Sequence, residues 1–193
     1  GQQDLQKPGT LTSDRLIGLA DMGQYNVAVA MVTRAASAKP TGALSHLKIT
    51  EVYYILRGSG TQVTGTLVNG EASGPSALIG RTVRGNAPLE NARRSRLGPG
   101  DIQIIPPGVA HAWGSIDAGG IDYLVYRIDP DHLLAMPAPQ PDTVARLSKL
   151  VPDFGSVSNP TDMTAETLKS FDLYSACIKA FADDPNYGVV VVP

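Results

Sequence analysis

Three side chains of this sequence have the chemistry of a metal site. His46 is followed five positions later by Glu51, and His111 lies in a second stretch, GDIQIIPPGVAHAWGS, from Gly100 to Ser115. Two imidazoles and one carboxylate form a ligand set that binds Fe(II), and the same donors suit zinc, manganese or nickel. Each residue also has an ordinary interpretation. His46 and Glu51 are then a surface pair beside a turn, and His111 is a core histidine.

The stretch around His111 predicts a strand that ends, turns and restarts. Pro106 and Pro107 cannot donate to a ladder, so the strand formed by DIQII ends before them. Gly108 permits a tight turn. The restarted strand then places His111 and Trp113, two positions apart, on one face.

Both stretches resemble the two motifs of the cupin superfamily. In the second motif Gly, five residues, Pro, one residue, Gly, two residues and His are matched by Gly100, Pro106, Gly108 and His111. Ser115 stands where the family usually has asparagine. The matched β region covers more than half of the chain.

The first motif is matched with one departure. The family has two histidines one residue apart, then three or four residues, a glutamate, six residues and a glycine. His46, Glu51 and Gly58 fit this spacing, and Leu44 occupies the position of the first histidine. The gap from Gly58 to Gly100 is long for the family.

The resemblance implies a small single-domain cupin of the quercetin-dioxygenase-like and germin-like kind. In that family the motif residues converge inside an antiparallel barrel and bind a divalent metal. The ligands here would be His46, Glu51 and His111, with coordination positions open for water or substrate. Ligand chemistry does not distinguish Fe, Zn, Mn and Ni. Leu44 removes one of four ligands, so it remains open whether three retain the metal.

Alternation along the strand that contains Glu51 selects further candidates. If Glu51 faces inward, Tyr53, Ile55 and Arg57 face the same way. Tyr53 and Trp113 are therefore expected to line the pocket as candidate catalytic residues. A phenol can donate a hydrogen bond to a bound oxygen anion, and an indole can stack on a planar ligand. Packing in the core is the competing interpretation for both.

Turn residues and apolar runs divide the chain into three parts. We expect an N-terminal arm over residues 1–23 with a short helix at 12–22, a barrel over 24–130, and an extension over 131–193. About seven β segments punctuated by turns predict a mainly β, antiparallel sandwich or barrel. The resemblance specifies this as a double-stranded β-helix, the cupin or jelly-roll barrel.

Other segments carry more local expectations. EVYYILRG and GTQVTGTLVNG, separated by residues 58–60, predict a hairpin. Residues 70–100 are too long for a structureless loop, so one or two short strands should lie there and cover a surface or pocket. Helical spacing predicts two helices packed on the barrel, at 142–151 with Asp142 as the cap and at 164–185. A terminal GVVVV would add an edge strand.

Composition bounds the partners. The 193 residues are 42% hydrophobic and carry a net charge of -2, so there is no electrostatic case for nucleic acid or an anionic membrane. No stretch is long enough to span a membrane. The single cysteine, Cys177, excludes an intrachain disulfide and is interpreted as a buried hydrophobe. The start GQQDLQ suggests export after signal-peptide removal; the alternative is a cytoplasmic protein.

Three functions stay open at this point. The first is a metal-dependent dioxygenase of a small organic substrate, and the second is an isomerase or lyase that uses the metal as a Lewis acid. The third is a non-catalytic protein that binds a small ligand, which Leu44 favours more than a four-ligand site would. Pairing through barrel edges, a family property, makes a homodimer the expected assembly.

Overall fold

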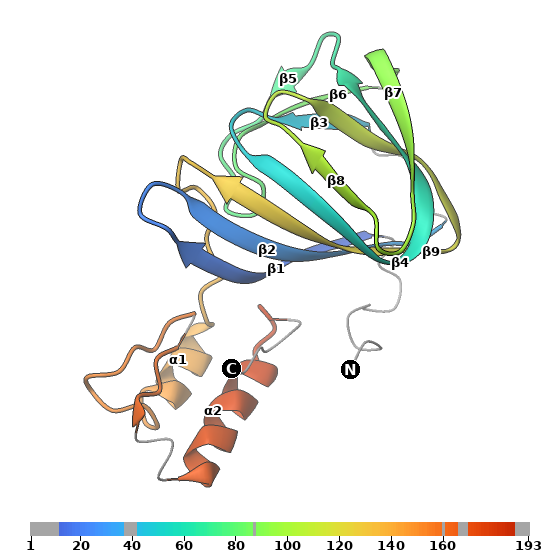
Figure 1. Ribbon diagram of the computed structural model, residues 1–193. Helices are drawn as coiled ribbons and strands as arrows, with labels where there is room; N and C mark the ends of the chain where they lie inside the picture. Colours follow the sequence, from blue (N-terminus) through green and yellow to red (C-terminus); the bar gives the residue numbers. More distant parts are fainter. Residues whose placement is uncertain (1–11, 37–41, 87, 160, 166–169, 188–193) are drawn as a thin grey trace. The chain divides into compact units, whose positions relative to one another are not determined.

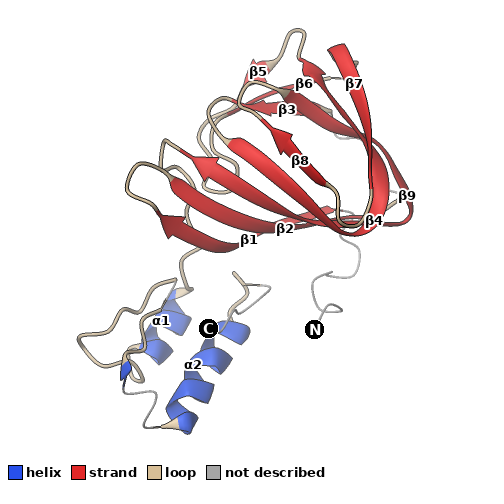
Figure 2. Ribbon diagram, in the orientation of Figure 1, coloured by secondary structure: helices blue, strands red, loops and turns tan. Residues whose placement is uncertain are grey.

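The computed structural model describes residues 12–36, 42–86, 88–159, 161–165 and 170–187. They fall into two compact units, a β unit that ends at Ala135 and a helical unit that begins at Met136. Figures 1 and 2 show the strands of the first unit and the helices of the second. The mainly antiparallel β fold with C-terminal helices, expected from the sequence, is confirmed.

The β unit is a sheet of nine strands within the described residues. Its strand order is β1-β2-β9-β3-β6-β5, and β4 pairs with β7, β8 and β9. The strands are β1 (Thr12–Asp21), β2 (Asn26–Arg34), β3 (Ala43–His46), β4 (Thr50–Thr66), β5 (Glu71–Ala72), β6 (Thr82–Gly85), β7 (Glu90–Leu97), β8 (Ile102–Ile105) and β9 (Ala110–Asp129).

Two long strands hold this unit together. β4 has 17 residues and β9 has 20, and they pair antiparallel over most of their lengths while both curve (Figure 1). The predicted hairpin at residues 58–60 is therefore wrong, because the chain runs on through these glycines. Gly58 has φ +74°, and a Cβ there would lie 1.9 Å from the carbonyl oxygen of Gly120. The glycine permits a close backbone approach between two paired strands instead of a turn.

The helix expected at residues 12–22 is also wrong, since this segment forms β1. Its backbone pairs with β2 from Thr12 opposite Arg34 to Asp21 opposite Asn26, with a register shift beside Gly18. The apolar spacing fitted a helix, but the shift lets Leu16 and Leu19 both pack inward against buried residues. Long-range pairing with β2 decides the structure of this segment, and the helical spacing of the sequence does not contain it.

The long segment at residues 70–100 contains β5, β6 and β7, in agreement with the prediction of short strands. Leu89 packs with Ala43 and Ala110 in a small buried cluster. Ile79 instead lines the interior cavity described below. The segment therefore covers part of the sheet and closes part of a pocket.

The interior of the β unit is built by alternation. Tyr53 is 5% exposed and Tyr54 is 38% exposed, as the period of a strand requires. Ile55 is buried, but Arg57 is exposed, contrary to the expected alternation, because the register shifts between the two. Ten residues form the main buried cluster: Ala30, Val32, Tyr53, Ile55, Leu97, Ile105, Trp113, Ile121, Tyr123 and Val125.

The helical unit contains α1 (Pro141–Leu147) and α2 (Phe171–Ala182). Gln140 is the N-cap of α1, so Asp142 lies in the first turn and is not the predicted cap. Cys177 packs with Leu147 in the core of this unit, as a buried hydrophobe should. The predicted edge strand in GVVVV lies outside the described residues. No helix in the described part of the chain is long and apolar enough to span a membrane.

Candidate metal and ligand site

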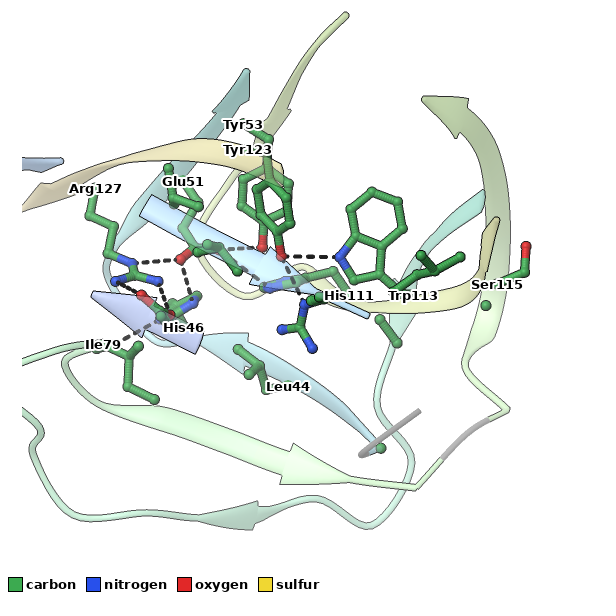
Figure 3. A pocket seen from close by; sticks show the side chains of 18 of the residues that line it. Leu44, His46, Glu51, Tyr53, Ile79, His111, Trp113, Ser115, Tyr123 and Arg127 are labelled. Atoms are coloured by element: carbon green, nitrogen blue, oxygen red, sulfur yellow. Dashed lines mark hydrogen bonds and ion pairs between the residues drawn. The ribbon is translucent and has the colours of Figure 1, made fainter. Parts of the chain in front are cut away.

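The two sequence motifs meet at one place in the β unit. His46 ends β3, Glu51 is the second residue of β4, and His111 is the second residue of β9. The backbone N–H of Gly108 donates to the carbonyl of His46 at 2.7 Å, so the turn of the second motif is hydrogen-bonded to the histidine of the first motif. The ligand atoms of His46, Glu51 and His111 lie within 4.8 Å of one another, and all three residues are buried (Figure 3).

Both imidazoles are held by a backbone carbonyl and turned toward the carboxylate. His46 Nδ1 lies 2.9 Å from the oxygen of Ile79, and His111 Nδ1 lies 3.4 Å from the oxygen of Val109. A carbonyl oxygen accepts only, so Nδ1 carries the proton in a neutral ring. The two Nε2 atoms then carry lone pairs, and each lies 3.3 Å from one oxygen of Glu51.

This arrangement fits a cation. Two acceptors at 3.3 Å repel each other unless a proton or a metal ion stands between them. A backbone carbonyl on Nδ1 is the usual way to hold a histidine whose Nε2 binds a metal. The donor set of two nitrogens and one carboxylate is also a known set for divalent transition metals. The group formed by His46, Glu51 and His111 therefore has the chemistry to hold such an ion.

Glu51 has two further partners, which the sequence reasoning did not find as a set. Arg127 Nε donates to Oε1 at 2.8 Å, and the hydroxyl of Tyr53 donates to Oε2 at 3.0 Å. Burial by itself raises the pKa of Glu51. Hydrogen bonds from His111 and His46, which their Nε2 atoms donate when the rings are protonated, and the charge of Arg127 outweigh it. The pKa of Glu51 is thus well below its usual range, and the carboxylate is ionised.

Arg127 connects Glu51 to a second acid. Its Nη groups bind Asp14 at 2.7 and 3.2 Å, and Nη1 also donates to the carbonyl of Leu78 at 3.0 Å. Burial acts to lower the pKa of Arg127, but the charges of Asp14 and Glu51 raise it above its usual value, so the guanidinium stays charged. The alternation of Tyr123 and Val125 could have indicated Arg127. Asp14 could not be assigned to the site from the sequence, because the segment that contains it was predicted to be a helix.

An aromatic wall stands beside this group. Tyr53 and Tyr123 have ring centroids 4.8 Å apart, and Trp113 Nε1 donates to the hydroxyl of Tyr123 at 3.1 Å. Arg34, at the end of β2, donates to the same hydroxyl through Nε at 2.9 Å. Burial raises the pKa of Tyr53 and so does the charge of Glu51; burial also raises the pKa of Tyr123, and Arg34 offsets part of this. Both phenols therefore keep their protons at neutral pH.

These residues surround a cavity of about 320 Å³. Tyr53 and Trp113 line it, where the sequence placed them, and so do Leu44 and Ser115 (Figure 3). Leu44 is the direct cross-strand partner of His111, so the position of the missing histidine does face the site. His132 lies outside this cavity. Its side chain is exposed, and its Nδ1 is 4.0 Å from Oδ1 of Asp21.

Similarity to known proteins was found among solved structures. No protein-family model matches the sequence, and no curated protein matches it. Among solved structures, a cupin-like protein from Thermotoga maritima is 18% identical, with 64% of this chain and 72% of that chain covered and a TM-score of 0.42. A hydroquinone 1,2-dioxygenase, PnpCD, in complex with Cd²⁺ and 4-hydroxybenzonitrile, is 15% identical over 64% and 68%, with a TM-score of 0.44.

A third solved structure is the DMSP lyase DddQ from Ruegeria pomeroyi, which is 23% identical, with a TM-score of 0.37. The match covers 56% of this chain and 41% of that chain, so the chain spans less than half the length of DddQ. These three structures are thus one protein described as cupin-like, one dioxygenase and one lyase. The antiparallel β architecture itself is established by the strand pairing of this chain.

Proposed function

We propose that His46, Glu51 and His111 bind a divalent transition metal, and that the cavity beside them binds a small organic substrate, which a dioxygenase reaction converts. The observation that carries the proposal is the pair of Nε2 atoms at 3.3 Å from the two oxygens of one ionised carboxylate. In this ligand set a bound metal supplies Lewis-acid chemistry, and iron also supplies oxygen chemistry.

The protein groups around the site have separate tasks in this proposal. Ile79 and Val109 fix the histidine rings through their carbonyls. Arg127 orients the carboxylate of Glu51 and keeps it ionised. Tyr53 holds its proton at neutral pH, so it acts as a hydrogen-bond donor and not as a base.

A second function has its own support. Arg127 and Tyr53 already donate to the oxygens of Glu51, and Leu44 offers no ligand atom. A buried network of ion pairs with protonated histidines satisfies the same contacts without any metal. The cavity would then belong to a non-catalytic protein that binds a small ligand. A metal-dependent isomerase or lyase would use the same metal site and cavity, but it would carry out no redox reaction with oxygen.

Metal analysis separates these functions. We expect protein purified without chelator to hold, or to take up on reconstitution, about one equivalent of a transition metal. His111→Ala should lose it, because one of three ligands is gone. His132→Ala is the matched control, since this histidine lies outside the cavity, and it should retain the metal.

A metal content below about a tenth of an equivalent, with no gain on reconstitution, would contradict the metal site. The non-catalytic ligand-binding protein would then remain as the proposed function. If iron is retained, oxygen uptake with a panel of small organic compounds tests the redox reaction. Turnover that proceeds equally with zinc and consumes no oxygen would favour the isomerase or lyase.

We also propose a homodimer that pairs through the outer face of the sheet. Ile102 and Ile104 lie on β8, which pairs only with β4 among the described strands, and each is 64% exposed. Exposed apolar side chains on an edge strand favour association. Light scattering should give twice the chain mass of 20.3 kDa; a monomer mass, or a dimer unaffected by Ile104→Asp, would contradict this interface.

A further inference from the structure

Arg34 carries a charge in the cavity wall that no acid balances directly. Its Nε donates to Tyr123, but within the described residues its two Nη groups make no hydrogen bond or ion pair. Asp14, the nearby acid in the same cavity, is already bound by both Nη groups of Arg127. The four N–H bonds of the Nη groups of Arg34 are therefore available to water or to a ligand in the cavity.

The hydroxyl of Tyr123 supplies one more free donor. It accepts from Arg34 at 2.9 Å and from Trp113 at 3.1 Å, which occupies both lone pairs of the oxygen. Its own proton must therefore point elsewhere, and the hydroxyl donates no hydrogen bond to the residues that the structure describes. Tyr53 differs, because its proton is bound by Glu51.

The free groups at this wall are thus all donors. The complement of several N–H groups and one O–H group is an acceptor, and beside a guanidinium it is an anion. A planar carboxylate matches the fork of an arginine with two parallel hydrogen bonds. Apolar side chains, among them Val32, Ile116 and Val125, line the same cavity. A volume of about 320 Å³ lies at the small end of ligand sites.

We propose that Arg34 and Tyr123 bind the carboxylate of a small organic acid and set the specificity of the cavity. What happens to the bound acid rests on the proposed function. The inference adds the chemical class of the ligand, a carboxylic acid. Binding of the carboxylate itself depends on the arginine and the phenol, so it is measurable with and without metal.

Trp113 provides the signal for the test. It is the sole tryptophan of the chain, and its indole is bonded to the hydroxyl of Tyr123. Titration of acetate, hexanoate and benzoate into the full chain, metal-free and zinc-loaded, should change its fluorescence. We expect at least one acid to bind more tightly than about 10 mM. The neutral amide of that acid should bind at least about tenfold more weakly, because charge-assisted hydrogen bonds are lost.

Variants assign the effect to residues. Arg34→Gln should weaken binding of the acid at least about tenfold, and Arg34→Lys should fall between it and the wild type, since the charge remains without the fork. Arg57→Gln is the matched control, because this arginine is exposed and pairs with Asp122 outside the cavity. Tyr123→Phe keeps the ring and should also weaken binding. It decides the test if the Arg34 variants do not fold.

The outcomes separate this inference from the proposed function. Binding of the acid that depends on Arg34, in a protein that takes up no metal, supports the carboxylate site and removes the metal enzyme. Metal uptake with no acid bound, or with affinity unchanged in Arg34→Gln and Tyr123→Phe, overturns the carboxylate site and leaves the metal centre.

Discussion

Replacement of Arg127 by methionine is the sharpest test of the buried network. The change removes the hydrogen bonds to Glu51, to both oxygens of Asp14 and to the carbonyl of Leu78. Each hydrogen bond to a charged group is worth about 1.5–3 kcal/mol. The variant also avoids the desolvation cost of burying the guanidinium, which offsets part of this loss. Removal of one partner from a buried ion pair costs about 3–5 kcal/mol overall. We expect a loss of this size, because two acids lose their partner.

Urea unfolding of the chelated protein at neutral pH, followed by circular dichroism, measures the loss as a free energy. Arg57→Met is the matched control, because its ion pair with Asp122 is exposed on the arginine side and should contribute less than about 1 kcal/mol. Zinc should restore more stability to Arg127→Met than to the wild type, since a cation would replace the lost charge beside Glu51. A loss no larger than that of Arg57→Met would refute the reasoning.

Two further predictions concern Glu51 and Gly58. Because the pKa of Glu51 is depressed, its stabilising effect is present above the unfolded-state value of about 4.3 and is lost as pH falls through the folded-state value. The difference in unfolding free energy between wild type and Glu51→Gln, from urea titrations between about pH 6 and pH 3, should therefore shrink; a constant difference would contradict the assignment. Gly58→Ala should cost about 2 kcal/mol or more, since its Cβ would overlap the carbonyl of Gly120. Gly23 has φ +82°, but a Cβ there would meet nothing within 4 Å, so Gly23→Ala should cost about 1 kcal/mol. Equal losses for the two variants would refute the role of the close approach between Gly58 and Gly120.

The sequence predicted the centre of the site because spacing and alternation are local properties. Glu51 and Tyr53 are two residues apart on one strand, and so are His111 and Trp113, so each pair had to share a face. What joined the pairs was the likeness of their spacing to a two-part motif. The strand pairing that brings them together is long-range, and no local pattern contains it.

The errors have equally specific causes. Arg57 broke the alternation because β4 has a register shift where it pairs with β9, and such a bulge depends on the partner strand. The turn predicted at Gly58 is wrong because glycine serves both tight turns and close backbone approaches, and the sequence does not distinguish them. Asp14 was placed on a helix, so its contact with Arg127 could not be foreseen. Long-range pairing decided all three.

The balance of charge in the cavity determines the effect of Leu44 at the position of the missing histidine. With neutral histidines, the acids Asp14 and Glu51 are matched by Arg34 and Arg127. Leucine at this position adds no ligand and no charge, so a divalent ion would leave the cavity with two positive charges in excess. A carboxylate bound at Arg34 would remove one of them, and the metal and the acid would then each raise the affinity of the other. An anionic ligand thus compensates electrostatically in a cavity where the fourth protein ligand is absent.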